Sequence, residues 1–239
     1  MRTSIKLFLG SMGLLGAGLL AYDLQLNAAF RKADYTQPFY NYVPLDFRDF
    51  DRIRLNSAAS LNIYLVKGDY HVKLNPRMAD LVKLQKEGGE LVITAHFPDR
   101  VNALNYALYI SCPTLKGIET SGEYYFRNQL VDTHIPEQLW YEPTVMKGFR
   151  VDSLQISEKD AGTIVLQDDR IGVLRAMVGA GSSLRIDAGN VIGGGDIAVL
   201  NKGQLTLKDT TGLNINHHLA DSATLILSGE AAKKLLKLH

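Results

Sequence analysis

The candidate catalytic residues of this sequence are acidic residues at the ends of two apolar segments. Asp168 and Asp169 follow one segment and precede Arg170, and Asp187 ends another. Paired carboxylates can act as general acid and base on polysaccharides, and some β-helix enzymes carry acidic and basic residues along one outer face. The neighbouring outward positions are of mixed type here, and no second carboxylate is expected to stack on Asp187. We therefore predict that the protein is not an enzyme, and a β-helix enzyme that acts on polysaccharides is the least favoured alternative.

Two glycine-rich stretches resemble phosphate-binding loops but lack the helix that such a loop requires. Residues 178–183 (VGAGSS) lead into the apolar segment 184–186, and the three glycines at 193–195 lead into the segment 197–199. A phosphate-binding loop holds its anion at the N-terminus of the helix that follows it. Because a strand is expected after both stretches, we reject a phosphate site in each and expect no cofactor.

His217 and His218, with Asp221 nearby, are the residues that could ligate a metal. Adjacent residues on a strand point to opposite faces, so this pair is a poor candidate for a shared metal ion, and we expect no metal site. Cys112 is the only cysteine, which excludes a disulfide within the chain and a Cys/His zinc cluster. It continues the alternation of Leu108 and Ile110, so we expect it to be a small buried apolar side chain.

One pattern of alternating residues returns four times and organises the C-terminal half of the chain. It covers residues 163–167 (TIVLQ), 183–187 (SLRID), 204–208 (QLTLK) and 224–228 (TLILS). The second and fourth residues of each copy are aliphatic, and the copies begin 20, 21 and 20 residues apart. Because side chains alternate between faces along a strand, each copy predicts a short strand with one apolar face. In the outward row, Asp187 and Lys208 should be neighbours of opposite charge.

A second, looser set of aliphatic pairs lies about halfway between these copies. It comprises Leu154/Ile156, Leu174/Ala176, Ile197/Val199 and Leu213/Ile215. Two strands in each repeat of about 20 residues, with glycines at the corners, are typical of a flattened β-helix, in which each repeat buries its apolar face by stacking on its neighbours. The sequence therefore predicts an all-β protein, a β-solenoid with about 20 residues per turn.

The composition is that of an ordinary globular protein. The chain has 239 residues, of which 46% are apolar and 21% charged, and its net charge is +1, from 26 basic and 25 acidic residues. A nucleic-acid-binding protein needs a basic face, which this balance does not suggest. We therefore expect no nucleic-acid partner.

The N-terminus carries a basic start followed by an apolar run. Arg2 and Lys6 precede an uncharged run that begins at Leu7 and ends at Tyr22, before Asp23. This order is typical of an export signal, either cleaved or kept as a membrane anchor. An uncleaved signal-anchor helix is the favoured interpretation, because small residues at a cleavage site are hard to place after the run. A buried helix of a soluble protein is the alternative.

Apolar alternation continues through residues 50–122, and here the motifs resemble a known family. The order is F-x-x-I at Phe50, an L-x-I-x-L-x-x-G strand at 61–68, a G-x-L-x-I strand at 89–93, and P-x-L-x-x-I-x-x-S-G at 113–122. This resembles the head domain of the putative autotransporter adhesins, also called the GIN domain (DUF2807), of Bacteroidetes. The resemblance covers about residues 45–229. It implies an exported or cell-surface β-solenoid and supplies no catalytic residues.

Residues 123–149 interrupt the repeats and are rich in aromatic residues. An insertion in a regular solenoid often protrudes and binds a ligand, and aromatic side chains are typical contact anchors. The candidate ligand-binding residues are Tyr124, Tyr125, Phe126, Trp140 and Tyr141. The alternative is a loop that folds back over the sheet and buries its aromatic side chains.

The expected organisation is a single domain with short terminal elements. Residues 1–33 form the signal-anchor or signal peptide with its stalk, 34–50 an aromatic-rich linker or N-terminal cap, 51–229 the solenoid, and 230–239 a short C-terminal cap helix. The aromatic segment 34–50 has a second interpretation as a recognition arm.

The predicted function is non-catalytic binding or adhesion at the cell envelope, on the extracytoplasmic side, either in the periplasm or at the cell surface. The expected partner is an envelope protein or polysaccharide, with the membrane contacted by the run from Leu7 to Tyr22. A structural or scaffolding role in the envelope is the alternative function.

Overall fold

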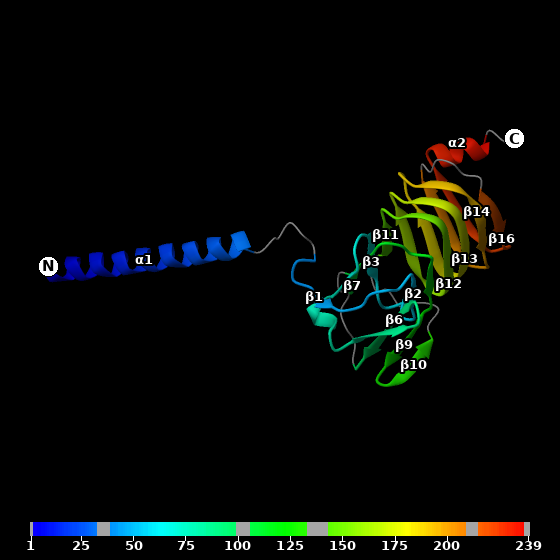
Figure 1. The fold of residues 1–239 in the computed structure, drawn as a ribbon. Coiled ribbons are helices and arrows are strands. Elements are labelled where there is room, and N and C mark those ends of the chain that lie inside the picture. Colours follow the sequence, from blue (N-terminus) through cyan, green and yellow to red (C-terminus); the bar gives the residue numbers. More distant parts are fainter. Residues whose placement is uncertain (1, 33–38, 99–105, 133–142, 209–214, 237–239) are drawn as a thin grey trace. The chain divides into compact units, whose positions relative to one another are not determined.

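The computed structural model describes residues 2–32, 39–98, 106–132, 143–208 and 215–236 of the chain. It divides into two compact units, residues 1–41 and residues 42–239. The first unit contains one helix, and the second contains the sheet and a short C-terminal helix (Figure 1).

The first unit is dominated by helix α1 (Arg2–Lys32). Its segment Ile5–Asn27 is 23 residues long, has a mean hydropathy of 1.6, and is not buried by any other part of the protein. A helix needs about 20 apolar residues to cross the hydrocarbon core of a bilayer. By length and composition, α1 is therefore able to span a membrane.

The second unit is built on a single sheet of 17 strands that curls on itself (Figure 1). Its strands are β1 (Val43–Leu45), β2 (Arg52–Leu55), β3 (Ile63–Lys67), β4 (His71–Leu74), β5 (Val82–Glu87), β6 (Glu90–Phe97), β7 (Leu108–Cys112), β8 (Gly117–Thr120), β9 (Glu123–Phe126), β10 (Gln129–Asp132), β11 (Thr144–Lys147), β12 (Arg150–Gln167), β13 (Arg170–Ile186), β14 (Val191–Val199), β15 (Gln204–Lys208), β16 (Ile215–Leu219) and β17 (Thr224–Ser228). A short 3₁₀ turn η1 (Pro76–Met78) precedes β5, and helix α2 (Glu230–Leu236) follows β17.

The repeat of about 20 residues is confirmed by the pairing register. Thr163 of β12 pairs with Ser183 of β13, Ser183 with Gln204 of β15, and Gln204 with Thr224 of β17, all in parallel. The predicted ion pair between Asp187 and Lys208 is also present, with Nζ and Oδ1 3.5 Å apart. Local alternation and repeat length were sufficient to predict this register, because a shift of one residue would turn every aliphatic side chain outward.

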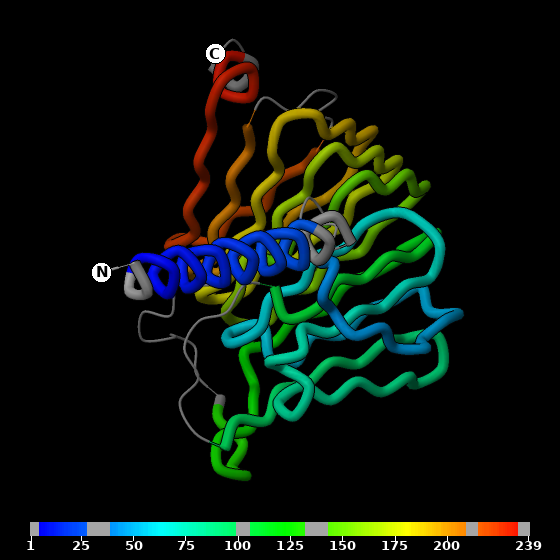
Figure 2. Tube along the Cα trace, turned by 90° about the vertical axis from the view of Figure 1, so that its left-hand side faces the viewer, coloured from blue at the N-terminus to red at the C-terminus, as the bar shows by residue number. Residues whose placement is uncertain are grey.

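The second ladder is present and is joined to the first. Strands β12 and β13 each continue through a bend, so one strand contributes to both ladders, and Figure 2 shows successive strands bending at the same level. Ala161 and Gly162 have positive φ in this bend. The register of the last two strands differs from the predicted pairs, because Leu174 pairs with Gly195 of β14 and Ile197 pairs with His217 of β16; Leu213 lies outside the described residues.

Two series of pairings connect the N-terminal half to the repeats. In one, β11 pairs in parallel with both β3 and β12, and β3 pairs with β7. In the other, β8 pairs in parallel with both β2 and β12, and β2 pairs with β6. Antiparallel pairs of β1 with β4, β4 with β7, and β5 with β6 complete this end of the sheet.

The aliphatic side chains on the inner face form one continuous core. Ile53, Leu65 and Leu91 of the N-terminal half belong to the same buried cluster as Leu166, Leu184 and Leu205 of the repeats. Cys112 is fully buried in this cluster, as predicted, and burial raises the pKa of its thiol to about 12. Burial of these side chains stabilises the strands that the alternating pattern of apolar residues predicted.

Residues 42–50 of the aromatic-rich segment pack on the sheet. Strand β1 pairs with β4, Phe50 is buried, and Phe47 packs against the core. The Tyr42 hydroxyl donates a hydrogen bond to the carbonyl oxygen of Tyr106 at 2.6 Å. Residues 42–50 therefore cover part of the first strands.

Candidate functional site

The hairpin formed by β9 and β10 is one of two described parts of the segment 123–149 that the sequence singled out; the other, residues 143–149, contains strand β11 and belongs to the parallel ladder. The two strands pair antiparallel from Glu123 opposite Asp132 to Phe126 opposite Gln129. The turn consists of Arg127 and Asn128, which have φ of 49° and 62°. Positive φ at both central residues is the geometry of a type I′ turn, whose twist matches that of the flanking strands.

The inward face of this hairpin packs against the protein. Tyr124 and Phe126 are half-buried against the core. The rings of Tyr124 and Phe97 lie 5.8 Å apart in an edge-to-face arrangement, which is favourable for aromatic pairs. These two predicted ligand-binding residues therefore have a packing role.

The outward face of the hairpin carries a row of three side chains from three strands, here called the hairpin patch. His96 of β6 pairs in parallel with Tyr125 of β9, and Tyr125 pairs with Leu130 of β10. The rings of His96 and Tyr125 are stacked, with centroids 4.4 Å apart and planes 4° from parallel. Leu130 is exposed. The patch therefore combines a fixed aromatic pair with an exposed aliphatic side chain.

The electrostatics of the hairpin patch favour a neutral surface. Burial lowers the pKa of the His96 imidazole, and the nearby charge of Lys83 lowers it further. Since an unperturbed histidine titrates near pH 6.5, His96 is neutral at pH 7. At the end of the hairpin, the Arg127 guanidinium lies 5.3 Å from the centre of the Phe126 ring, within the range of a cation–π contact.

Two of the five predicted ligand-binding residues, Trp140 and Tyr141, lie outside the described residues. Of the other three, Tyr125 is the one whose side chain belongs to the outward row. The ligand-binding role of all five stays a prediction.

A cluster of tyrosines on the outward face of β3 and β7 was missed by the sequence analysis. Tyr64 pairs with Tyr109, and their rings lie 6.3 Å apart and 15° from parallel. Tyr106 meets Tyr64 edge-to-face at 5.2 Å, and the Lys73 ammonium lies 5.7 Å from the Tyr109 ring. Alternation places Tyr64 and Tyr109 on the outward face, but their pairing joins segments about 45 residues apart and was not predictable from local pattern.

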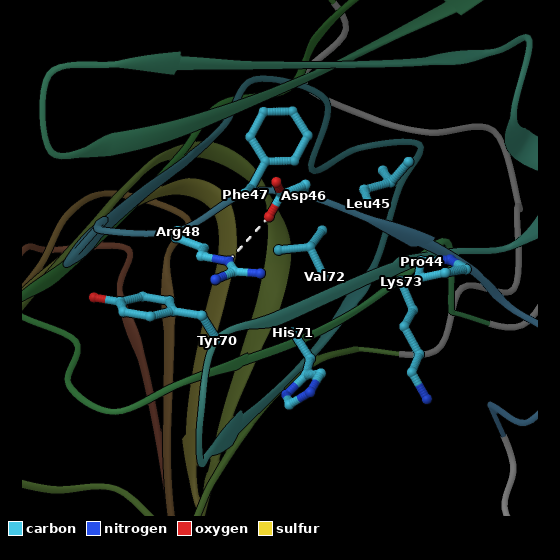
Figure 3. A pocket seen from close by; sticks show the side chains of 9 residues that line it. All are labelled: Pro44, Leu45, Asp46, Phe47, Arg48, Tyr70, His71, Val72 and Lys73. Carbon is cyan, nitrogen blue, oxygen red and sulfur yellow. Dashed lines mark hydrogen bonds and ion pairs between the residues drawn. The ribbon is translucent and has the colours of Figure 1, made fainter.

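A shallow pocket of about 310 Å³ lies beside β1 and β4 (Figure 3). Its lining combines opposite charges with apolar groups, and the Arg48 Nε and the Asp46 Oδ1 form an ion pair at 3.0 Å. Tyr70 in its wall donates a hydrogen bond to the carbonyl oxygen of Phe50 at 3.1 Å. Since both partners of the ion pair are largely exposed and neutralise each other, we assign no ligand to this pocket. The lining residues are Pro44, Leu45, Asp46, Phe47, Arg48, Tyr70, His71, Val72 and Lys73.

The acidic residues considered for catalysis have structural contacts. Asp169 is buried and accepts hydrogen bonds from the backbone N–H groups of Phe149 (2.7 Å) and Gln167 (3.2 Å). Asn190, one repeat later, accepts a bond from the Asp169 N–H at 2.9 Å. Burial raises the pKa of Asp169 to about 7, although the two backbone donors act in the opposite direction. Asp187 is paired with Arg185 and Lys208.

Glu158 is a buried acid that the sequence analysis did not identify. It lies on β12, where it pairs with Thr120 of β8 and Val178 of β13, and it is fully buried. Neither carboxyl oxygen has a partner in good hydrogen-bond geometry, and the same holds for the buried Thr120 hydroxyl; the backbone N–H of Ile164 is the donor that acts to lower the pKa of Glu158. Burial raises the pKa of Glu158 well above its usual range. The alternation of Leu154 and Ile156 continues to position 158 and places it on the same inward face, so the two-residue period was the signal that could have identified this residue.

Within the described ranges, no group of three His, Cys, Asp or Glu side chains could hold a metal ion. His217 occupies the inner row of β16, and His218 points to the opposite, exposed face. The two rings are therefore on different faces, as expected for neighbours on a strand.

Comparisons with solved structures gave remote similarities. A protein of Bacteroides fragilis described as a putative adhesin has a TM-score of 0.42 and 14% identity, over 77% of this chain and 95% of that chain. A putative adhesin of Parabacteroides distasonis has a TM-score of 0.36 and 11% identity, over 77% and 95%. A putative lipid binding protein of the same species has a TM-score of 0.27 and 14% identity, over 79% and 98%. No family model and no curated protein matches the chain.

Proposed function

We propose that this chain is a non-catalytic binding domain of the cell envelope, of the adhesion type, that contacts its ligand through the hairpin patch of His96, Tyr125 and Leu130. In this proposal the parallel ladders form a β-solenoid of the GIN type, as the motifs between Phe50 and Gly122 suggest. Helix α1 holds the domain at a membrane, and the sheet lies on the extracytoplasmic side.

The observation that carries the proposal is the stacked pair of His96 and Tyr125 next to the exposed Leu130. Each of the three side chains is on a different strand, so the sheet fixes their relative positions before a ligand arrives. Rigid aromatic side chains provide large contact area at a low cost in conformational entropy. Such a patch is suited to recognition.

A polysaccharide is the ligand class that best fits the hairpin patch. The three side chains of the patch carry no charge at pH 7, because the pKa of His96 is lowered, so the patch is suited to a neutral ligand. A sugar ring can place its apolar C–H face against the electron-rich face of an aromatic ring. An aromatic or aliphatic side chain of an envelope protein is the second ligand class.

Replacing Tyr125 with Ala tests the proposal. The full chain in detergent micelles would be screened against a glycan array and against envelope proteins, and Tyr125→Ala should weaken the binding that is found by about tenfold. Met177→Ala is the matched control, because Met177 is also an exposed apolar residue but lies on β13, away from the hairpin. Trp140→Ala tests the predicted contribution of the residues outside the described ranges.

Binding that is equal in the wild type and Tyr125→Ala, with both proteins folded by circular dichroism, would refute the role of the hairpin patch. Removal of the whole segment 123–149 is a poorer test. Strand β11 lies in that segment and pairs with both β3 and β12, so the deletion would remove a strand from the sheet.

A further inference from the structure

The last repeat leaves one side of the sheet without a partner in the described part of the chain. Strand β17 pairs with β15, and β16 pairs with β14, and neither has a described strand on its other side. Helix α2 packs against β15 and β17, and its Ala231 is buried in the core. The N–H and C=O groups along the outer edge of β17 are therefore available to another strand.

Burial decreases sharply at this edge. Leu205 and Leu207 of β15 are fully buried, whereas Leu225 and Leu227, their counterparts on β17, are half-buried. Ile226 is 43% exposed, although its counterpart Thr206 is only 6% exposed. The apolar face of the last repeat is therefore incompletely covered, which is unfavourable for a water-exposed surface.

The sequence of β17 offers no protection against edge-to-edge pairing. The strand reads TLILS and contains no charged residue and no proline. Natural edge strands are usually blocked by Lys, by Pro or by a bulge, and an uncharged apolar edge favours association. The lack of these devices at this edge suggests that the edge has a partner.

The same five residues are nearly palindromic, which identifies the partner. In an antiparallel pair centred on Ile226, Leu225 faces Leu227 of the second copy, Thr224 faces Ser228, and Ile226 faces itself. Both inner leucines then lie on the core face, and the outer isoleucines contact each other across the two-fold axis. A two-fold axis also produces a closed assembly with no free edge at this strand.

We propose that two copies of this chain associate tail to tail by antiparallel pairing of β17 with β17 of the second copy. The pair extends each sheet by the strands of the other copy and covers the half-buried leucines of the last repeat. This proposal is independent of the ligand of the hairpin patch.

Disulfide cross-linking of Ile226→Cys tests the register. The native Cys112 is buried and the pKa of its thiol is raised to about 12, so the introduced cysteine would be the reactive one. Mild oxidation of the full chain in detergent micelles should give a covalent dimer, because position 226 faces itself. Val173→Cys is the control, since Val173 is 38% exposed but lies on β13.

Charge substitutions at the same position give a second test that does not depend on oxidation. Ile226→Lys and Ile226→Glu should each weaken the dimer by about tenfold, because like charges would face each other. An equimolar mixture of the two variants should restore dimers, as measured by sedimentation velocity in micelles. This rescue cannot be explained by misfolding.

Three results would overturn the proposal. They are a monomeric wild type, equal cross-linking of the position 226 and position 173 variants, and an Ile226→Lys variant that dimerises as strongly as the wild type. The last result would place the contact elsewhere, for example on α1.

Discussion

At the scale of single residues, Glu158 is an unfavourable group in the core. Its carboxyl group is fully buried beside Thr120 and Val178, and neither oxygen has a partner in good hydrogen-bond geometry, so burial outweighs the opposing effect of the Ile164 backbone N–H on its pKa. A buried carboxylate without a partner is strongly destabilised relative to water, so the protonated form is favoured in the folded state. An unfolded chain loses the same proton near pH 4.3.

The stability of the protein should therefore fall as pH rises. Between about pH 4.3 and the raised pKa of Glu158, the folded state binds a proton that the unfolded state has lost, and the free energy of unfolding decreases with pH. Asp169, with its pKa raised to about 7, acts in the same direction up to that pH. The favourable contribution is fully present below pH 4 and is lost at higher pH.

Glu158→Gln should remove much of this pH dependence. The amide cannot ionise, so at pH 8 the variant should be more stable than the wild type by about 1–3 kcal/mol, and at pH 4 the two should be similar. Urea denaturation at both pH values measures the difference. Glu87→Gln is the control, because Glu87 is exposed at the end of β5. Identical pH profiles of Glu158→Gln and the wild type would contradict the prediction.

At the scale of elements, the stacking of β12 on β13 requires glycine in the bend, at Gly179. Gly179 lies on β13 in the bend, where its backbone passes close to the preceding repeat. A Cβ atom added at Gly179 would overlap the carbonyl oxygen of Lys159. Because that oxygen belongs to the backbone of β12, it cannot move without disturbing the pairing of the two longest strands.

Gly179→Ala should lower the free energy of unfolding by more than about 2 kcal/mol, since the added methyl group separates two paired strands. Thermal denaturation followed by circular dichroism measures this loss. Gly89→Ala is a matched control, because the nearest atom to its added Cβ is a side-chain oxygen of Asp51 at 3.6 Å and its φ is not positive. A loss at Gly179 no larger than at Gly89 would show that the bend can relax.

At the scale of the whole molecule, the proposed location of the sheet at a membrane depends on α1. Its 23-residue apolar segment can span a bilayer and is not buried by the rest of the protein. Leu14 and Leu15 lie near the middle of that segment and are exposed. A charged residue at the centre of a spanning helix costs about 2.5–3.5 kcal/mol, so this position is sensitive to charge.

The double variant Leu14→Lys and Leu15→Lys should leave the membrane fraction. Two lysines at the centre of the helix add about 5–7 kcal/mol to the cost of insertion. Fractionation after an alkaline wash measures the distribution, and Leu14→Ala with Leu15→Ala is the control that keeps the helix apolar. A wild-type chain that is shortened and soluble would show instead that α1 is a cleaved signal.

The two proposed surfaces are compatible with each other. Figure 1 shows β9 and β10 at the opposite end of the sheet from α2, which follows β17. A dimer joined through β17 therefore leaves both hairpin patches accessible. Two patches on one assembly would increase the apparent affinity for a repetitive polymer such as a polysaccharide, because the second contact becomes intramolecular.

The sequence by itself determined the features that depend on local alternation and on the repeat length. The aliphatic residues at the second and fourth positions of each copy predicted the strands, and the spacing of 20 or 21 residues predicted the parallel register. The same register predicted the pair of Asp187 with Lys208, and the alternation around Cys112 predicted its burial. These features follow from the two-residue period of a strand.

The tertiary structure decided which segments that are distant in sequence lie side by side. The pairing of β6 with β9 places Tyr125 on His96 and turns Tyr124 and Phe126 toward the core, although all three aromatic residues are adjacent in sequence. The pairing of β11 with β3 and the open edge of β17 have the same origin. Such contacts depend on how the whole sheet curls, and no local pattern encodes that curvature.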